Sequence, residues 1–360
     1  MDFSVHGENL IFLISQPRAG STLLQRILGS HPDIHTVSEP WLLLPSIYAL
    51  REKGHWAEYD ASMACRAMQE FLRTLPQGEG DYIEGVRRMY AYLYERGLSE
   101  SAKKYFLDKT PRYYFIIPEL KRLFPKGHFI ILLRNPLAVL CSILDSWVRG
   151  AWFLLGEQKY DLLTAPQRLL AGIESSGEQC IVVHYEKLVS EPESEVQEIC
   201  DKLGVKFVPR MIDYGRSDSS SWRYGDQVEV DYHIRPVPQN AEKWIQSLEN
   251  PQVWRLARDY LRFLGKETII QMGYSCEELD EILDNYRPSP NRLWLTYPLR
   301  LLLNGLRWTD RFYTWDRRVI WLITLLRQQG INETVKVIAH KLAKPKRGSE
   351  ESLSVPDAVG

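Results

Sequence analysis

The stretch LIFLISQPRAGSTLLQRILG, residues 10–29, decides the fold. It begins with a short apolar run, residues 10–14, which is typical of a strand buried on both faces. Residues 16–22 are mostly small or turn-forming, and residues 23–28 have apolar side chains at helical spacing. A strand, a loop of small residues and a helix in this order predict a phosphate-binding cradle, because the N–H groups at a helix N-terminus attract anions.

The cradle departs from the P-loop pattern G-x-x-x-x-G-K-[ST]. Gly20 is followed by Ser21 and Thr22, so no lysine stands where it would reach a β- or γ-phosphate. A working ATPase or a small kinase is therefore disfavoured. Backbone N–H groups, two hydroxyls and the cation of Arg18 remain, and they suit a terminal anion held without a metal. An ordinary strand-to-helix turn capped by Ser21 is the alternative.

Three more segments, residues 105–108, 128–133 and 180–185, indicate buried strands, and helical patterns lie between them. Strands that alternate with helices predict an α/β fold with a P-loop-like central parallel sheet flanked by helices. Residues 208–240 have no period and predict a long loop, and such loops are often functional. Helical spacing resumes over residues 241–264.

A second motif, LLRNPLAVLCS, occupies residues 132–142. The predicted strand ends at Arg134, Pro136 suits the first turn of a helix, and Ser142 lies two turns further on. Open parallel sheets bind ligands at the carboxyl ends of their strands, so Arg134 is a candidate ligand contact. A surface salt bridge is the alternative role for this arginine.

Three segments occur in the order and spacing of one enzyme family: QPRAGSTLL at residues 16–24, the motif at 132–142, and HYEKLVSEPESEVQEICDKLG at residues 184–204. The chain resembles the sulfotransferases that use PAPS (3′-phosphoadenosine 5′-phosphosulfate), and within them the branch that includes tyrosylprotein and carbohydrate sulfotransferases. The resemblance spans residues 9–275. It implies transfer of a sulfuryl group from PAPS to an acceptor hydroxyl, with no metal.

The resemblance also implies which residues bind PAPS. The loop 18–22 matches the loop that holds the 5′-phosphosulfate, Arg134 and Ser142 match a pair that binds the 3′-phosphate, and Tyr185 matches a tyrosine beside the adenine. A late segment resembles a loop that closes over the nucleotide and supplies a lysine to it, although it is one residue shorter here. The full set is Arg18, Ala19, Gly20, Ser21, Thr22, Arg134, Ser142, Tyr185, Arg235 and Lys243.

Two catalytic residues follow from the same resemblance. Sulfuryl transfer to a hydroxyl needs a proton acceptor and a cation that offsets charge on the leaving oxygen. Glu39 matches the glutamate that serves as the base, and Lys109 matches the lysine near the leaving oxygen. His31 and His35 are alternatives for the base, since other members of the family use a histidine. A purely structural role for Glu39 and a plain surface charge at Lys109 also stay open.

The acceptor is not named by the sequence. In this family the acceptor-facing residues lie on variable loops, which correspond here to residues 41–56, 147–156 and 222–233. Their Trp and Tyr content suits a hydroxyl-bearing glycan, lipid or small molecule. The alternative to an enzyme is a catalytically inactive nucleotide-binding protein of the same fold.

The composition excludes several other classes. The chain has 360 residues, 44% of them apolar, which suffices for one large or two medium domains. A net charge of −1 argues against a nucleic-acid partner. The five cysteines are scattered and never form a C-x-x-C pair, so we expect no disulfide framework and no metal site. The N-terminus has no secretory pattern, and we expect a cytoplasmic protein of open oligomeric state.

Basic charge gathers near the C-terminus. Residues 286–347 contain 13 Lys or Arg against three Asp or Glu, a net charge of +10, together with four tryptophans. Basic amphipathic helices of this kind are typical of peripheral membrane contact. Holding an acidic or lipid-linked acceptor, or packing on the catalytic domain, are the alternatives. We expect a sulfotransferase domain over residues 1–285, a helical extension over 286–347 and a disordered tail over 348–360.

Overall fold

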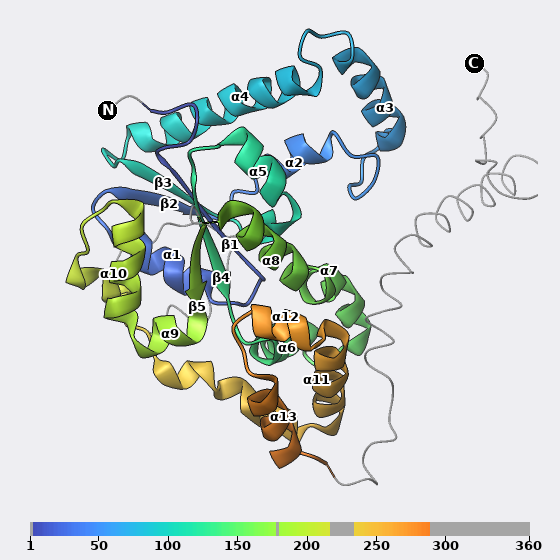
Figure 1. The fold of residues 1–360 in the computed structure, drawn as a ribbon, viewed down its shortest axis with the longest axis vertical. Coiled ribbons are helices and arrows are strands. Elements are labelled where there is room, and N and C mark those ends of the chain that lie inside the picture. Colours follow the sequence, from blue (N-terminus) through green and yellow to red (C-terminus); the bar gives the residue numbers. More distant parts are fainter. Residues whose placement is uncertain (1–2, 178–179, 217–233, 289–360) are drawn as a thin grey trace, which may run out of the picture. The chain divides into compact units, whose positions relative to one another are not determined.

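A five-stranded, all-parallel sheet forms the centre of the protein (Figure 1). The computed structural model describes residues 3–177, 180–216 and 234–288. The strands lie in the order β2-β3-β1-β4-β5. Their bounds are β1 Leu10–Ser15, β2 Ile34–Ser38, β3 Tyr105–Lys109, β4 His128–Leu133 and β5 Cys180–His184. The α/β fold with a central parallel sheet that the sequence predicts is confirmed.

Helices follow or connect the strands on both faces of the sheet (Figure 1). The crossover helices between parallel strands keep both faces away from water. Their bounds are α1 Ser21–Gly29, α2 Leu43–Tyr48, α3 Ala61–Leu72, α4 Glu79–Ser99, α5 Ile117–Leu123, α6 Pro136–Ile143, α7 Lys159–Leu163, α8 Ala165–Ser176, α9 Tyr185–Ser190, α10 Pro192–Leu203, α11 Pro251–Leu264, α12 Lys266–Gln271 and α13 Cys276–Asn285.

The core has two layers, one on each face of β1. All six residues of β1 are buried, which explains why residues 10–14 form a continuous apolar run. Phe12 points to the face where α4, α5 and α8 pack, and Leu13 points to the face where α1, α9 and α10 pack. The central strand is therefore fixed from both sides, and the loop at its carboxyl end starts from a rigid position.

Some boundaries differ from the sequence patterns. The strand β2 is not among the predicted ones, because only Ile34 of its five residues is fully buried and no continuous apolar run marks it. The expected helix over residues 241–264 divides into a 3-10 segment, Lys243–Glu249, and α11. The division falls at Asn250, whose side chain accepts a hydrogen bond from the Gln252 N–H and so caps α11.

The predicted C-terminal extension and tail, residues 286–347 and 348–360, lie almost wholly outside the described residues. The central part of the predicted long loop, residues 217–233, does so as well. In its described parts that loop forms 3-10 turns at Pro209–Ile212, Tyr214–Arg216 and Pro238–Ala241. Within the ranges that the structure covers, no helix is both long and apolar enough to cross a membrane.

Candidate functional site

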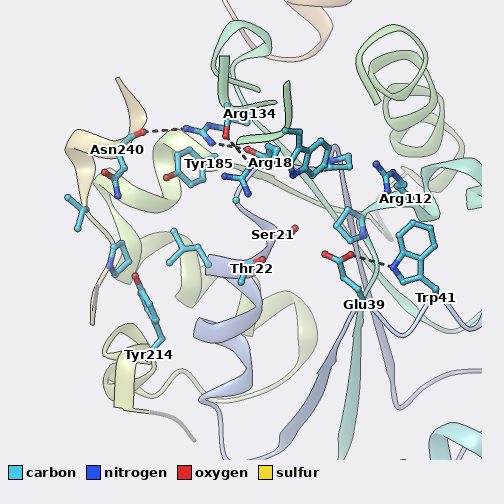
Figure 2. Close-up of a pocket in the computed structure, with 18 residues that line it drawn as sticks. Arg18, Ser21, Thr22, Glu39, Trp41, Arg112, Arg134, Tyr185, Tyr214 and Asn240 are labelled. Carbon is cyan, nitrogen blue, oxygen red and sulfur yellow. Dashed lines mark hydrogen bonds between the residues drawn. The ribbon is translucent and has the colours of Figure 1, made fainter. Parts of the chain in front are cut away.

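A cavity of about 280 Å³ lies at the carboxyl ends of the central strands (Figure 2). The residues around it come from the cradle, from the segments after β2, β3 and β4, and from the start of α9. This is the sheet edge at which parallel α/β proteins bind ligands. Among the sequence-predicted site residues, those that line the cavity are Arg18, Gly20, Ser21, Thr22, Glu39, Arg134, Ser142 and Tyr185.

The cradle between β1 and α1 has an unusual backbone. Arg18 has a φ of 68° and Gly20 a φ of 99°, so two residues of this short loop are left-handed. A Cβ added at Gly20 would lie 2.3 Å from Cδ2 of Tyr185, which explains why glycine stands there. Ala19 is buried, and its N–H donates to the Gln16 carbonyl oxygen. No side chain caps α1, so the alternative role of Ser21 as a cap is not supported.

Arg134 lies beside this cradle, just beyond the end of β4. Its Nη1 donates to the Arg18 carbonyl oxygen at 2.9 Å, its Nη2 donates to the Asn240 carbonyl oxygen at 3.3 Å, and the guanidinium lies 4.2 Å from the centre of the Tyr185 ring. Its Nε is buried and has no hydrogen-bond partner among the described residues. A buried charged donor without a partner is costly, and an anion bound here would supply the partner.

Arg18 and Ser142 are in contact at the cavity wall although they are far apart in the sequence. Arg18 Nε donates to the Ser142 hydroxyl at 3.1 Å. Ser142 lies on α6, whose start is fixed because the Asn135 side chain accepts from the N–H groups of Leu137 and Ala138. The sheet edge thus brings together two arginines and a hydroxyl, a set of groups that suits phosphate or sulfate oxygens.

Glu39 and Lys109 form an ion pair next to the cradle. The backbone N–H of Glu39 donates to the Lys109 carbonyl oxygen at 3.0 Å, which continues the β2–β3 pairing by one residue. Lys109 is completely buried, and its Nζ lies 2.9 Å from Glu39 Oε1 and 3.5 Å from the Thr22 hydroxyl. Glu39 has a φ of 47°, and such strained backbone is concentrated at functional sites.

Asp108 precedes this lysine and is held in a buried hydroxyl network. Tyr94 and Tyr113 donate to its Oδ2 at 2.6 and 2.9 Å, and Thr110 donates to its Oδ1 at 2.7 Å. Burial raises the pKa of the Asp108 carboxyl to about 6, although the three hydroxyl donors act in the opposite direction. The network joins α4, β3 and the 3-10 turn Pro111–Phe115, and so fixes the strand end that carries Lys109.

The two histidines proposed as alternative bases do not line the cavity. Both ring nitrogens of His31 are used by the backbone: Nδ1 accepts from the Asp33 N–H, and Nε2 lies 3.0 Å from the Lys206 carbonyl oxygen. The His35 ring packs edge-on against Phe106. Burial, followed by the charge of Lys103, lowers the pKa of His35. The geometry therefore favours Glu39 over either histidine.

Three of the predicted PAPS contacts lie away from the cavity lining, namely the buried Ala19 of the cradle, Arg235 and Lys243. Arg235 forms an ion pair with Asp213 at 2.7 Å, and Lys243 is exposed at the start of its 3-10 segment. Their neighbours Pro236, Val237 and Asn240 line the cavity instead. Nucleotide contacts by Arg235 and Lys243 stay predictions.

Other lining residues have no role assigned by the sequence motifs. Arg112 follows Lys109 by three residues, and its guanidinium pairs with Asp161 at 2.6 Å. Tyr214 and Asn240 also line the cavity. Trp41 and Trp147 also line the cavity, and both lie in loops that the sequence predicts to face an acceptor. The aromatic content of these loops is the sequence signal that points to the two residues. Nothing in the local sequence around Arg112 indicates its partner, because Asp161 is 49 residues away.

The comparisons with known proteins agree with the motifs. The model of the sulfotransferase family matches residues 10–209. Nodulation protein NoeE of Sinorhizobium fredii is 32% identical over 216 residues, which are 54% of this chain and 50% of that protein. Protein-tyrosine sulfotransferase 1 of Danio rerio is 27% identical over 250 residues, 66% of this chain and 65% of that protein. The chain thus spans half to two thirds of the length of these relatives.

Solved structures with a similar fold include two sulfotransferase domains. The domain from the Synechococcus olefin synthase is 25% identical, covers 65% of this chain and 86% of its own, and has a TM-score of 0.47. The domain from the curacin biosynthetic pathway is 20% identical, covers 74% of this chain and 97% of its own, and also has a TM-score of 0.47.

Proposed function

The chain belongs to the sulfotransferase family, whose description matches more than half of its residues, and we propose that it moves a sulfuryl group from PAPS to a hydroxyl of an acceptor. When bound, PAPS supplies the activated sulfuryl group. The acceptor is a glycan, a lipid or a small molecule that offers a hydroxyl. The relatives' names, which include protein-tyrosine sulfotransferases, support the reaction class.

The cavity offers a fitting set of donors for the nucleotide. We infer that the loop 18–22 holds the 5′-phosphosulfate through its backbone N–H groups and the Ser21 and Thr22 hydroxyls. Arg134 and Ser142 bind the 3′-phosphate, and the unpartnered Nε of Arg134 supports this role. Tyr185 packs beside the adenine. No step of this assignment needs a metal ligand.

The observation that carries the proposal is the place of Lys109 between the base and the cradle. Its Nζ contacts both the Glu39 carboxylate and the Thr22 hydroxyl, at 2.9 and 3.5 Å. Glu39 accepts the proton of the acceptor hydroxyl, and Lys109 offsets the negative charge that develops on the leaving oxygen. The ion pair keeps the Glu39 carboxylate and the Lys109 ammonium group in contact before any ligand binds.

Replacing Glu39 by glutamine tests the assignment of the base. Glu39→Gln keeps the shape of the side chain and removes the proton acceptor, so kcat should fall by about 10²–10⁴ while the affinity for PAP changes little. Transfer is measured with labelled PAPS and the best acceptor from a panel of glycans, glycolipids and phenols. PAP affinity is measured by calorimetry. Glu174→Gln, an exposed change on α8, is the matched control.

Two outcomes would contradict parts of the proposal. If Glu39→Gln retains turnover and His35→Asn abolishes it, the base is His35. If the unaltered protein binds PAP but transfers sulfate to none of the acceptors, the alternative of an inactive nucleotide-binding protein of the same fold gains support. Failure to bind PAP at all would overturn both.

A further inference from the structure

Arg112 is held in place at the cavity wall by a buried carboxylate. Its Nε donates to Asp161 Oδ1 at 3.0 Å, and its Nη2 donates to Asp161 Oδ2 at 2.6 Å. The Asp161 side chain is 2% exposed and also accepts from the Tyr114 hydroxyl at 2.6 Å. A two-point pair of this kind fixes the plane of the guanidinium, which a single contact would leave free to rotate.

Two tryptophans flank this guanidinium (Figure 2 labels Arg112 and Trp41). The Arg112 Cζ lies 5.5 Å from the Trp41 ring centre and 5.7 Å from the Trp147 ring centre, and all three residues line the cavity. Trp41 has a φ of 54°, and its Nε1 donates to Glu39 Oε2 at 3.4 Å. Arg112 is therefore separated from the proposed base by a single aromatic ring.

One edge of the guanidinium remains unused. Arginine carries five N–H donors in a rigid fork. Asp161 occupies the edge formed by Nε and Nη2, and Nη1 makes no hydrogen bond with any described residue. The Arg112 side chain is 30% exposed and belongs to the cavity lining. Two oriented N–H groups are thus available to a molecule bound in the cavity.

The charges on this side of the cavity cancel. Asp161 neutralises Arg112, and Glu39 neutralises Lys109. Arg134, on the nucleotide side, contacts carbonyl oxygens and a tyrosine ring. Of the other lining cations, Arg18 lies with Arg134 and Ser142 at the cradle, so Arg112 is the cation beside the tryptophans and its charge is balanced by Asp161. A neutral acceptor does not depend on an attraction between charges.

We propose that Arg112 positions an uncharged acceptor, donating from Nη1 to an oxygen next to the hydroxyl that Glu39 deprotonates. This rests on the proposed sulfotransferase function. A sugar ring has this chemistry, because a second hydroxyl stands beside the reacting one and the C–H faces of the ring can pack on Trp41 and Trp147. The substrate class that follows is a neutral glycan or glycolipid headgroup.

The test measures weak binding directly, with PAP bound and no turnover. Saturation-transfer NMR detects contact with methyl glycosides of the common hexoses and deoxyhexoses, with analogues that lack one vicinal hydroxyl, and with an acidic tyrosine peptide. We expect at least one glycoside to bind and the peptide not to compete with it. Removal of the correct vicinal hydroxyl should weaken binding about tenfold or more, as for a hydrogen bond to a charged group.

Arg112→Lys is the matching protein variant, because lysine keeps the ion pair with Asp161 but provides no second edge. This substitution should weaken glycoside binding about as much as removal of the vicinal hydroxyl does. It should raise the KM for the acceptor more than it lowers kcat, and it should leave PAP binding unchanged. Arg122→Lys, at a surface ion pair with Glu79, is the matched control. The analogue series needs no variant, so it decides the question even if Arg112→Lys folds poorly.

Several results would overturn the inference. They are binding of the acidic peptide in preference to every glycoside, the absence of any glycoside signal, or equal binding by all deoxy analogues. Each of these can occur with intact PAP binding, in which case the proposed function survives and only the acceptor assignment fails. Loss of PAP binding in the unaltered protein would instead remove the premise.

Discussion

At the scale of single residues, Arg134 lines the cavity and its buried Nε has no hydrogen-bond partner among the described residues. The sequence motif gave this arginine two readings, a ligand contact and a surface salt bridge. The structure shows it against two carbonyl oxygens and a tyrosine ring, with no carboxylate partner among the described residues. Among the described residues nothing supports the salt bridge, and the ligand contact stays a prediction that can be measured.

Arg134→Ala should weaken PAP binding by about 1.5–3 kcal/mol, because charge-assisted hydrogen bonds to the 3′-phosphate are lost. Adenosine 5′-phosphosulfate has no 3′-phosphate, so its affinity should change much less. Calorimetry with both ligands makes the comparison, and Arg122→Ala serves as a surface control. Equal losses for the two ligands would show that Arg134 reads some other part of the nucleotide.

The proposed catalytic pair, Glu39 and Lys109, shows how much residue patterns can predict. The resemblance points to Glu39 and Lys109 separately, and the structure shows that they touch because β2 and β3 pair in register. The pairing of Arg112 with Asp161 could not be predicted in the same way. It joins the segment after β3 to α7, two elements that only the packing of the chain brings together.

At the scale of elements, a strand can be predicted from the sequence when it is buried along its whole length. The strands β1 and β3 are buried along their whole length, and β4 along all but its first residue. The sequences of β1 and β4 are apolar runs for this reason, whereas β3 begins with three apolar or aromatic residues and ends in the buried Asp108 and Lys109. The edge strand β2 has four half-buried residues and lacks that signal. It is held by its ladder with β3 and by the Thr36 hydroxyl, which donates to the Leu107 carbonyl oxygen.

The hydroxyl network at the end of β3 predicts a pH-dependent stability. Burial raises the folded-state pKa of Asp108 to about 6, above its ordinary value. The folded protein therefore holds a proton that the unfolded chain releases at lower pH, so the contribution of Asp108 to stability is full in acid and is lost as pH rises to about 6. Asp108→Asn cannot titrate, and this pH dependence should disappear in it.

Urea unfolding at pH 5 and pH 7.5 measures the effect. The difference in unfolding free energy between the unaltered protein and Asp108→Asn should shift by about 1 kcal/mol between the two pH values, in favour of the unaltered protein at pH 5. Comparing differences cancels the titration of all other groups. The absence of any shift between these two pH values would mean that the three hydroxyl donors outweigh burial and keep the carboxylate ionised in the folded protein.

At the scale of the whole molecule, the sheet edge brings together residues from positions 17–41, from positions near 110, 140 and 185, and from the loop before residue 241. The order of the motifs along the chain could predict this gathering, because parallel strands present all their carboxyl ends at one edge. The boundary between the sulfotransferase domain and the C-terminal extension stays a prediction. It rests on the charge of residues 286–347 and on the Pro288-Ser289-Pro290 segment near their start.

That charge leads to the last prediction, that residues 286–347 bind anionic membranes. A net charge of +10 with four tryptophans should give up to about 1 kcal/mol per well-placed Lys or Arg, and binding should fade with salt because charges are screened within about 10 Å at 0.1 M. Tryptophan fluorescence of a 286–347 fragment and of the whole protein is titrated with anionic vesicles, with neutral vesicles as the control.

A solvated basic surface would also be attracted to anionic vesicles, so binding alone does not demonstrate membrane insertion. Burial of the tryptophan rings does distinguish the two cases. Only an apolar face inserted among the lipids moves these rings out of water, so a blue shift is expected in the fragment and in the whole protein. A shift in the fragment alone would mean that the same face is already covered in the intact chain. In that case the extension contacts the rest of the protein, and the membrane hypothesis is wrong.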